Sequence, residues 1–234
     1  MIEIWAGIAE AFRLIWSLDE DLIDITVRSL KVSLTALVIA STLALPLGTW
    51  LAIHRFSYRR FTISVLNALM GLPPVVVGLI VYMLLSRSGP FGVMGLLFTP
   101  TAMIIAQVII ISPLIASITH QAMRELWFEY HDLLISLNTT KRQRVGALIW
   151  DGRRTLLTAA LAGFGRAIGE VGAIMIVGGN IDQVTRVLTT AIALETGKGD
   201  FALALGLGFI LITLSLLVNL TIHALSRTKS EGRW

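Results

Sequence analysis

The sequence has no cysteine and few charged residues. Only 15% of its 234 residues are Asp, Glu, Lys or Arg, while 55% are hydrophobic, and the mean hydropathy is +0.79. The absence of cysteine excludes a disulfide framework and any thiolate nucleophile or thiolate metal site. A typical soluble domain has about 25% charged residues, so charge this scarce leaves an apolar excess that a soluble core could not bury. The composition therefore indicates a protein whose main solvent is lipid.

Catalytic motifs are also absent from the sequence. It contains no GxSxG and no HExxH, and its four histidines do not have metal-ligand spacing. It also lacks a P-loop of the form GxxxxGK[ST], so any coupled ATP chemistry, with its Mg²⁺, would belong to a separate chain. We therefore expect no catalytic residue, no metal site and no cofactor in this chain. A membrane-embedded enzyme is the weaker alternative.

Uncharged apolar runs long enough to cross a bilayer account for most of the chain, since a spanning helix needs about 20 such residues. The uncharged stretch 88–119 is too long for one span. Its start, GPFGVMGLLFTP, is typical of an apolar loop or re-entrant piece, and the helix proper should begin near Thr101, after Pro100. We predict an all-α integral membrane protein with five transmembrane helices, at about 32–53, 61–86, 101–119, 155–178 and 201–222.

Basic residues predict the orientation of these spans, because cytoplasmic loops are enriched in Lys and Arg. The link between spans one and two, the link between spans three and four, and the C-terminal tail carry twelve basic residues, whereas the opposite side carries six. The N-terminus is therefore predicted outside and the C-terminus in the cytoplasm. Because topology accounts for the net charge of +4, no nucleic-acid partner is expected.

Two segments on the predicted outer side have helical patterns. Residues 1–24 contain an amphipathic stretch at 2–17 with tryptophans near its ends, which suits a helix lying in the membrane interface, followed by a link. Residues 184–194 place apolar side chains at helical spacing, so this loop should fold back as a short helix. Whether either helix has a role beyond that of an ordinary loop helix is left open.

Residues 120–154 form the one sizeable polar stretch, on the predicted cytoplasmic side. Within it, Leu133, Leu134 and Leu137 fall on one helical face, Asp132 stands at the start of this helix, and Asn138 suits its C-terminal end because Asn tolerates the left-handed conformation. Such an apolar face either packs on the chain's own membrane helices or docks onto a soluble partner. The predicted docking residues are Glu129, Asp132, Leu133, Leu134, Ser136, Leu137 and Asn138.

Span four contains most of the stretch LAGFGRAIGEVGAIMIVGGN, residues 161–180. It carries Arg166 and Glu170 near the middle of the bilayer, where an unpaired charge costs at least about 2.5 kcal/mol. The two residues are four apart, so they should share a helical face and partly neutralise each other. The pair is either a structural lock or a charged element beside an anion path. Gly165 and Gly169 form a GxxxG step, extended by Gly172, that should let another helix approach closely.

Two further features of the spans bear on a path. Pro73 and Pro74 interrupt span two and free backbone groups in mid-membrane, which indicates either a plain kink or a lining of a cavity. Asn180, at the end of the glycine-rich segment, is a further path candidate.

The 120–154 loop resembles the cytoplasmic coupling loop of permease subunits in binding-protein-dependent ABC importers. That family has Glu-Ala-Ala, three residues, Gly, nine residues, then Ile-x-Leu-Pro. Here Asp132-Leu133-Leu134 stands at Glu-Ala-Ala, Asn138 at the Gly, and Leu148-Ile149-Trp150-Asp151 at the last element, where the Pro is lost. Residues 72–92 and 165–205 further resemble molybdate- and tungstate-type permeases, and TTAIALETGKGDF is most similar to the tungstate branch.

The resemblance implies a type I ABC importer permease fold over residues 25–225, with 226–234 as a cytoplasmic tail. It also implies a prokaryotic cell-membrane protein that acts as a homodimer, with two ATP-hydrolysing subunits beneath it and an external oxyanion-binding protein above it. The function it implies is ATP-driven import of tungstate or molybdate by alternating access. An importer of sulfate or of an amino acid is the alternative, because specificity in such systems would lie mainly in the binding protein.

Overall fold

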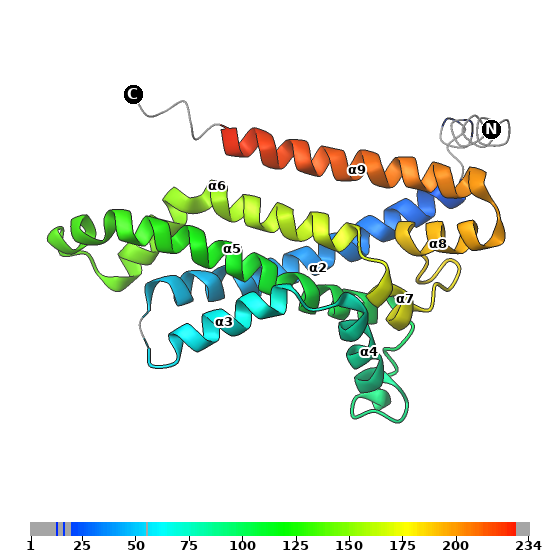
Figure 1. Ribbon diagram of the computed structural model, residues 1–234, viewed down its shortest axis with the longest axis horizontal. Helices are drawn as coiled ribbons and strands as arrows, with labels where there is room; N and C mark the ends of the chain where they lie inside the picture. The colour runs from blue at the N-terminus through cyan, green and yellow to red at the C-terminus, as the bar shows by residue number, and fades with distance from the viewer. Residues whose placement is uncertain (1–12, 14–15, 17–19, 55, 228–234) are drawn as a thin grey trace.

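The computed structural model describes residues 13, 16, 20–54 and 56–227, and this part of the chain is all-helical. The prediction of an all-α protein is therefore confirmed for the described residues. They form eight α-helices and one 3-10 turn (Figure 1): α2 (Glu20–Ile53), α3 (Arg59–Met70), α4 (Pro74–Leu85), η1 (Gly92–Met94), α5 (Pro100–Ser136), α6 (Lys141–Ile168), α7 (Gly172–Gly178), α8 (Leu188–Lys198) and α9 (Phe201–Arg227).

Three helices, α2, α5 and α9, are long and apolar enough to cross a membrane, and the number rises to five if two bent helix pairs each count as one span. The bent pairs are α3 with α4, at 98°, and α6 with α7, at 62°. Spans two and four were predicted as single helices over 61–86 and 155–178, and this was wrong in both cases. Each predicted span is two helices separated by a short break.

The α2 and α5 helices pack against each other along much of their length and form the axis of the bundle. Their close approach depends on Gly48, where an added Cβ would lie 2.5 Å from the carbonyl oxygen of Ala116. The 37 residues of α5 extend about 55 Å at 1.5 Å per residue, well beyond a hydrocarbon core of about 30 Å. The helix starts at Pro100, as predicted, and its second half leaves the apolar region.

Residues 120–154 are helical rather than a loop that carries one short helix. Residues up to Ser136 continue α5 without interruption, a four-residue turn follows, and α6 begins at Lys141. A capping box starts α6: the Thr140 hydroxyl accepts from the N–H of Gln143, and the Gln143 side chain accepts from the N–H of Thr140. The predicted coupling segment is thus a helical hairpin that extends two membrane helices.

The outer segments agree in part with prediction. The helix expected over 184–194 is present as α8, but it begins at Leu188 and runs to Lys198. It packs on α9, and Leu188 and Ala191 are buried against Leu22 and Ile25 of α2. The stretch 88–99 contains η1 and turns but no α-helix, as expected for an apolar loop. The interfacial helix predicted at 2–17 lies almost entirely outside the described residues.

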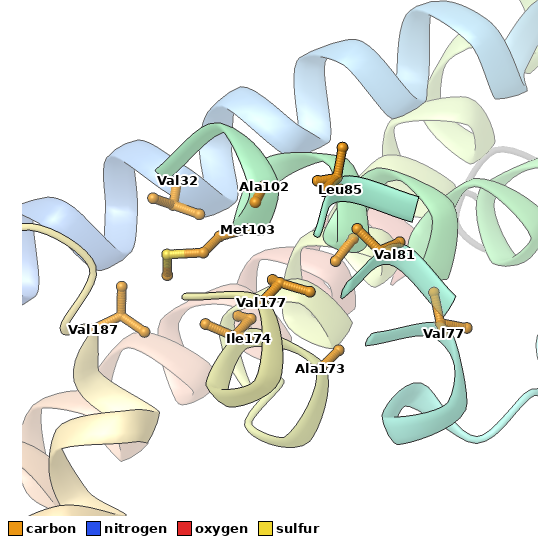
Figure 2. Packing of buried hydrophobic residues seen from close by; sticks show 11 residues of the cluster. Val32, Val77, Val81, Leu85, Ala102, Met103, Ala173, Ile174, Val177 and Val187 are labelled. Carbon is orange, nitrogen blue, oxygen red and sulfur yellow. The ribbon is translucent and has the colours of Figure 1, made fainter. Parts of the chain in front are cut away.

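A buried apolar cluster joins the short helices to the bundle. Val77, Val81 and Leu85 of α4 face Ala173 and Ile174 of α7 in Figure 2. Val177 of α7 belongs to the same cluster. From the other side, the cluster is closed by α2, α5 and the residue before α8, with Val32, Ala102, Met103, Ala106 and Val187. The core therefore holds α4 and α7 together as a unit, and α4 projects away from the long axis of the other helices (Figure 1).

Candidate functional site

The two helix breaks meet at one place in the structure. The first break comprises residues 71–73, between α3 and α4, and Pro74 occupies the first turn of α4, where its missing N–H removes no helical hydrogen bond. The preceding residue, Pro73, has an extended backbone (φ −62°, ψ 121°), as the residue before a proline prefers. The two prolines therefore produce a full break in the helix and not the plain kink that was one of the two predicted alternatives.

The second break comprises residues 169–171, between α6 and α7, and it lies against the first. An added Cβ at Gly172 would lie 2.6 Å from the Val75 side chain, and one at Gly78 would lie 2.6 Å from the Cα of Ala173. Only glycine at both positions permits this distance between α4 and α7. Of the predicted path residues, Pro73, Pro74 and Glu170 are thus brought together with Gly172 at one junction.

Glu170 is buried in this break, with 6% of its surface exposed. Its Oε1 accepts a hydrogen bond from the N–H of Ala173 in the first turn of α7, at 3.3 Å. The first N–H groups of a helix have no intrahelical partner, and a carboxylate at a helix N-terminus is also favoured by the helix dipole. The acidic side chain in span four therefore has a local structural explanation: it caps the helix that restarts after the break.

Side chains from other helices bind two backbone carbonyl groups at the break. The Thr189 hydroxyl, from α8, donates to the carbonyl oxygen of Glu170 at 2.8 Å. Gln107, buried in α5, donates from Nε2 to the carbonyl oxygen of Ala167 at 3.0 Å, and a longer contact of 3.4 Å joins it to the Ser33 hydroxyl of α2. Sequence reasoning missed Gln107 and Thr189. The available signal was an amide in the middle of an uncharged apolar span, where an unsatisfied polar group is costly.

Arg166 does not pair with Glu170, so the predicted mutual neutralisation was wrong. Arg166 lies in the last turn of α6, and no ion pair joins it to a carboxylate among the described residues. The helix ends at Ile168, so Glu170 no longer shares a helical face with Arg166. Instead, Arg166 is exposed on the isolated chain, where the C-terminal dipole of α6 favours its charge.

The predicted glycine packing face was only partly right. An added Cβ at Gly169 would meet no atom of another helix within 4 Å, and one at Gly165 would meet only the Val218 side chain, at 3.8 Å. Close helix approach therefore depends on Gly172, and on Gly78 of the partner helix, which was not singled out from the sequence. Among the described residues, the GxxxG step of Gly165 and Gly169 has no tight contact.

Asn180 lies beyond the far end of α7, so it is not part of the junction. It has a left-handed backbone (φ 50°) and follows Gly179 (φ 69°), which ends α7. Its Oδ1 is buried and has no hydrogen-bond partner among the described residues. About 10 Å of helix separates it from Glu170, since α7 has seven residues.

The predicted docking residues lie at the far end of the bundle, at the tip of α5. Leu133 and Leu137 are 54% and 64% exposed, whereas Leu134 is 9% exposed. Asn138 has the left-handed backbone that the sequence predicted, with φ 49°. The remaining candidates, Glu129, Asp132 and Ser136, are exposed at the same tip, where the Ser136 hydroxyl donates to the carbonyl oxygen of Leu133.

Further contacts close the turn after this tip. The Arg144 guanidinium donates to the carbonyl oxygen of Thr139 at 2.8 Å, and the Thr139 hydroxyl donates to that of Leu134. Further along α6, Trp150 is exposed, whereas Leu148 is buried in a cluster with Met123 of α5. The tip therefore presents an apolar surface on a turn that is held in place by hydrogen bonds.

Neither site has the composition of a metal centre. No group of three or more His, Cys, Asp or Glu side chains within the described ranges is placed to hold an ion. The two regions instead differ in kind: one is a polar junction of broken helices in the apolar part of the bundle, and the other is an apolar surface at its polar end.

The sequence matches the family of binding-protein-dependent transport system inner membrane components over residues 44–230. It is 41% identical to the tungstate uptake system permease protein of Peptoclostridium acidaminophilum, covering 93% of this chain and 97% of that one. It is 39% identical to a probable anion ABC transporter permease protein of Haloferax volcanii (91% and 93% covered) and 35% identical to the tungstate uptake system permease protein of Campylobacter jejuni (96% and 94% covered). Permeases named for sulfate or molybdenum transport are more distant, at 25–27% identity.

The capping role of Glu170 predicts different outcomes for two substitutions. Glu170→Ala removes the acceptor of the Ala173 N–H and should lower the free energy of unfolding by about 1–3 kcal/mol. Glu170→Gln keeps an acceptor oxygen and should retain most of the stability, as should the control Glu125→Ala on an exposed part of α5. The measurement is thermal unfolding of the purified variants. A Gln variant as unstable as the Ala variant would show that the charge, and not the acceptor, is required.

Proposed function

The chain belongs to the family of binding-protein-dependent transport system inner membrane components, and on that premise we propose that it is the permease subunit of an ATP-driven tungstate importer. The substrate assignment rests on sequence identity: the chain is 41% and 35% identical to two permeases named for tungstate, but only 26–27% identical to permeases named for sulfate or molybdenum. Molybdate is the second candidate, because it too is a tetrahedral oxyanion. Sulfate or an amino acid is the more distant alternative.

We further propose that the N-terminus faces the outside and the C-terminus the cytoplasm, with five crossings. The start of α3, the α5–α6 turn and the C-terminal part of α9 all lie toward one end of the bundle in Figure 1, and the sequence is basic at or near each of them. The segment α8 lies toward the other end. Since lysine and arginine are enriched on the cytoplasmic side, this arrangement supports one orientation for the whole chain.

The proposed assembly contains two copies of the permease, two ATP-binding subunits that hold ATP and Mg²⁺, and an external oxyanion-binding protein. The exposed position of Arg166 supports a second copy, because a charged side chain in mid-membrane is costly unless protein or water covers it. Two copies that enclose a water-filled path between them would provide that cover. This one path would then have an arginine from each copy.

Arg166 is the proposed positive element of this path, beside the junction of the broken helices. Irregular backbone at membrane depth is tolerated where it is buried in protein or lines a cavity. The two breaks are close in space, because Val75, just after the first, contacts Gly172, just after the second. A fixed positive charge that does not pair with Glu170 remains available to a passing oxyanion. Alternating access would then change which end of this junction is open.

The exposed face of Leu133 and Leu137 is the proposed docking surface for the ATP-binding subunit. These side chains are four residues apart, so they point the same way from the tip of α5. Protein interfaces often depend on a few anchor side chains that contribute most of the binding energy, and two exposed leucines at the polar end of a membrane protein could serve as such anchors. The buried side chain of Leu134 would instead support the tip from within.

Tungstate uptake tests the substrate directly. In liposomes that contain the permease with its ATP-binding subunit and binding protein, we expect ATP-dependent tungstate uptake that a 100-fold excess of sulfate leaves nearly unchanged. Molybdate should compete less well than unlabelled tungstate. Binding measurements on the partner binding protein should give the same order of affinities. Preferential uptake of sulfate would overturn the substrate assignment while leaving the permease assignment in place.

The path role predicts a transport defect without a stability defect. Arg166→Gln should slow uptake about tenfold, equivalent to about 1.4 kcal/mol of lost electrostatic stabilisation, while thermal stability stays within the wild-type range. Arg166→Lys keeps the charge and should retain part of the rate. Arg154→Gln, an exposed position on the same helix, is the control and should transport normally. If Arg166→Gln transports at the wild-type rate per folded complex, the arginine does not act on the anion.

The docking surface predicts a loss of ATPase affinity. Leu133→Asp or Leu137→Asp should each cost about 2 kcal/mol or more, or about 30-fold in the dissociation constant. Ile135→Asp is the matched control, because Ile135 is also exposed but lies on the opposite side of the same helix. Affinity is measured by titration of the ATP-binding subunit onto the purified permease. Equal losses for all three variants would indicate a general effect of charge at the tip and not an oriented surface.

A further inference from the structure

A pocket of about 520 Å³ lies between the end of α2, the start of α3 and the middle of α5, apart from both sites described above. Three arginines line it: Arg59 and Arg60 from α3 and Arg124 from α5. No Asp or Glu is among the described residues that line it. The pocket therefore combines three positive charges with no negative one.

The arginines differ in how they are held. Arg59 is tied to the end of α2, since its Nε donates to the carbonyl oxygen of Leu51 at 2.9 Å and its Nη2 to that of Ala52 at 3.4 Å. It thereby caps the C-terminus of α2 and has a structural task. Arg60 and Arg124 are exposed, and neither forms an ion pair with a carboxylate among the described residues. Their guanidinium donors are the ones available to a ligand.

Three aromatic side chains form another part of the wall, which Ala52, Ile53 and Ser57 complete. Phe56, Trp127 and Phe128 line the pocket, and the Arg124 guanidinium carbon lies 5.5 Å from the centre of the Phe128 ring. This cation–π contact restricts the orientation of Arg124. The pocket thus has a positively charged part, in which Arg124 is partly preorganised, and an apolar part. Such a pocket suits a ligand that has both an anionic group and an apolar group.

The level of the pocket along α5 fits the membrane interface. Arg124 lies twelve residues before the end of α5 at Ser136, which is about 18 Å along the helix from the docking tip. It also follows the apolar part of the helix closely, and tryptophan is enriched at this level of membrane proteins. Headgroup phosphates of the cytoplasmic leaflet would lie at the same depth.

We propose that this pocket binds a tetrahedral oxyanion group through Arg60 and Arg124, with Arg59 as a fixed third charge. Two sources have this chemistry: the phosphate of an anionic lipid headgroup and a free oxyanion such as tungstate or phosphate. Arginine suits either, because its planar fork binds phosphate-like oxygens bidentately. The volume favours the headgroup, since pockets of 300–1,000 Å³ typically hold ligands of drug size and not a bare anion.

The test measures thermal unfolding of the full-length permease in detergent with four probes: phosphatidylglycerol, phosphatidylcholine, sodium tungstate and sodium phosphate. Phosphatidylglycerol at about ten times its dissociation constant should raise the unfolding temperature of the wild type by about 3–6 °C. Phosphatidylcholine, whose headgroup has no net charge, should give a smaller rise. A response to tungstate or phosphate without one to phosphatidylglycerol would identify the free anion as the ligand.

Two pairs of variants distinguish binding in the pocket from non-specific attraction to positive charge elsewhere on the protein. Arg60→Gln with Arg124→Gln should weaken phosphatidylglycerol binding about tenfold or more, because two charge-assisted contacts are lost. Arg142→Gln with Arg154→Gln removes the same charge from exposed positions on α6 and should leave binding unchanged. Equal losses in both pairs, or no preference of the wild type for any anionic probe, would overturn the proposal.

A charge-conserving pair covers the case in which the Gln variants fail to fold. Arg60→Lys with Arg124→Lys keeps both charges but removes the bidentate donors, so binding should weaken by a few-fold. If the Lys pair binds as tightly as the wild type, the attraction is that of charge alone and the pocket is not a site. The result is independent of the uptake experiment, since lipid binding can be present whichever anion the importer carries.

Discussion

The requirement that backbone N–H and C=O groups find hydrogen-bond partners away from water governs the centre of this protein. Two helices break in the apolar part of the bundle, and each break frees groups that lipid cannot satisfy. The chain solves this locally, with a proline that has no N–H at one break and with side-chain partners at the other. Glu170, Thr189 and Gln107 come from three different elements and all bind backbone groups at the second break. The position of α7, and of α4 packed upon it, depends on them.

The two charged side chains of span four are both costly in a membrane, and the structure explains each of them differently. Glu170 is buried and is accounted for within the chain, because it caps α7. Arg166 is exposed, and within the described residues only the C-terminal dipole of α6 favours its charge; the proposed second copy would supply the rest of its environment. The two charges of span four are therefore separated in the structure: one supports the junction from within, and the other lies on the surface of the chain.

The sequence predicted the all-helical class and the left-handed backbone of Asn138 correctly, because these depend on local composition and on single-residue backbone preference. It failed at the breaks. Arg166 and Glu170 were assigned to one helical face on the assumption of a continuous helix, and the glycines were assigned to one GxxxG face for the same reason. The tight contact is between Gly78 and Ala173, ninety-five positions apart, and no periodicity within one span can reveal such a pairing. Likewise, a polar loop and the extension of an apolar helix have similar sequence patterns, so the hairpin of α5 and α6 was read as a loop.

The uninterrupted length of α6 has a mechanical consequence. Its 28 residues form a rod of about 42 Å that begins at the capped turn beside the docking tip and ends at the break beside Glu170. Such a rod acts as a lever: a tilt of about 10° at the capped end displaces the other end by about 7 Å, provided that the helix stays rigid. A force applied to the tip by a partner would therefore reach the junction of the broken helices as displacement, with no need for a chemical signal to pass from residue to residue.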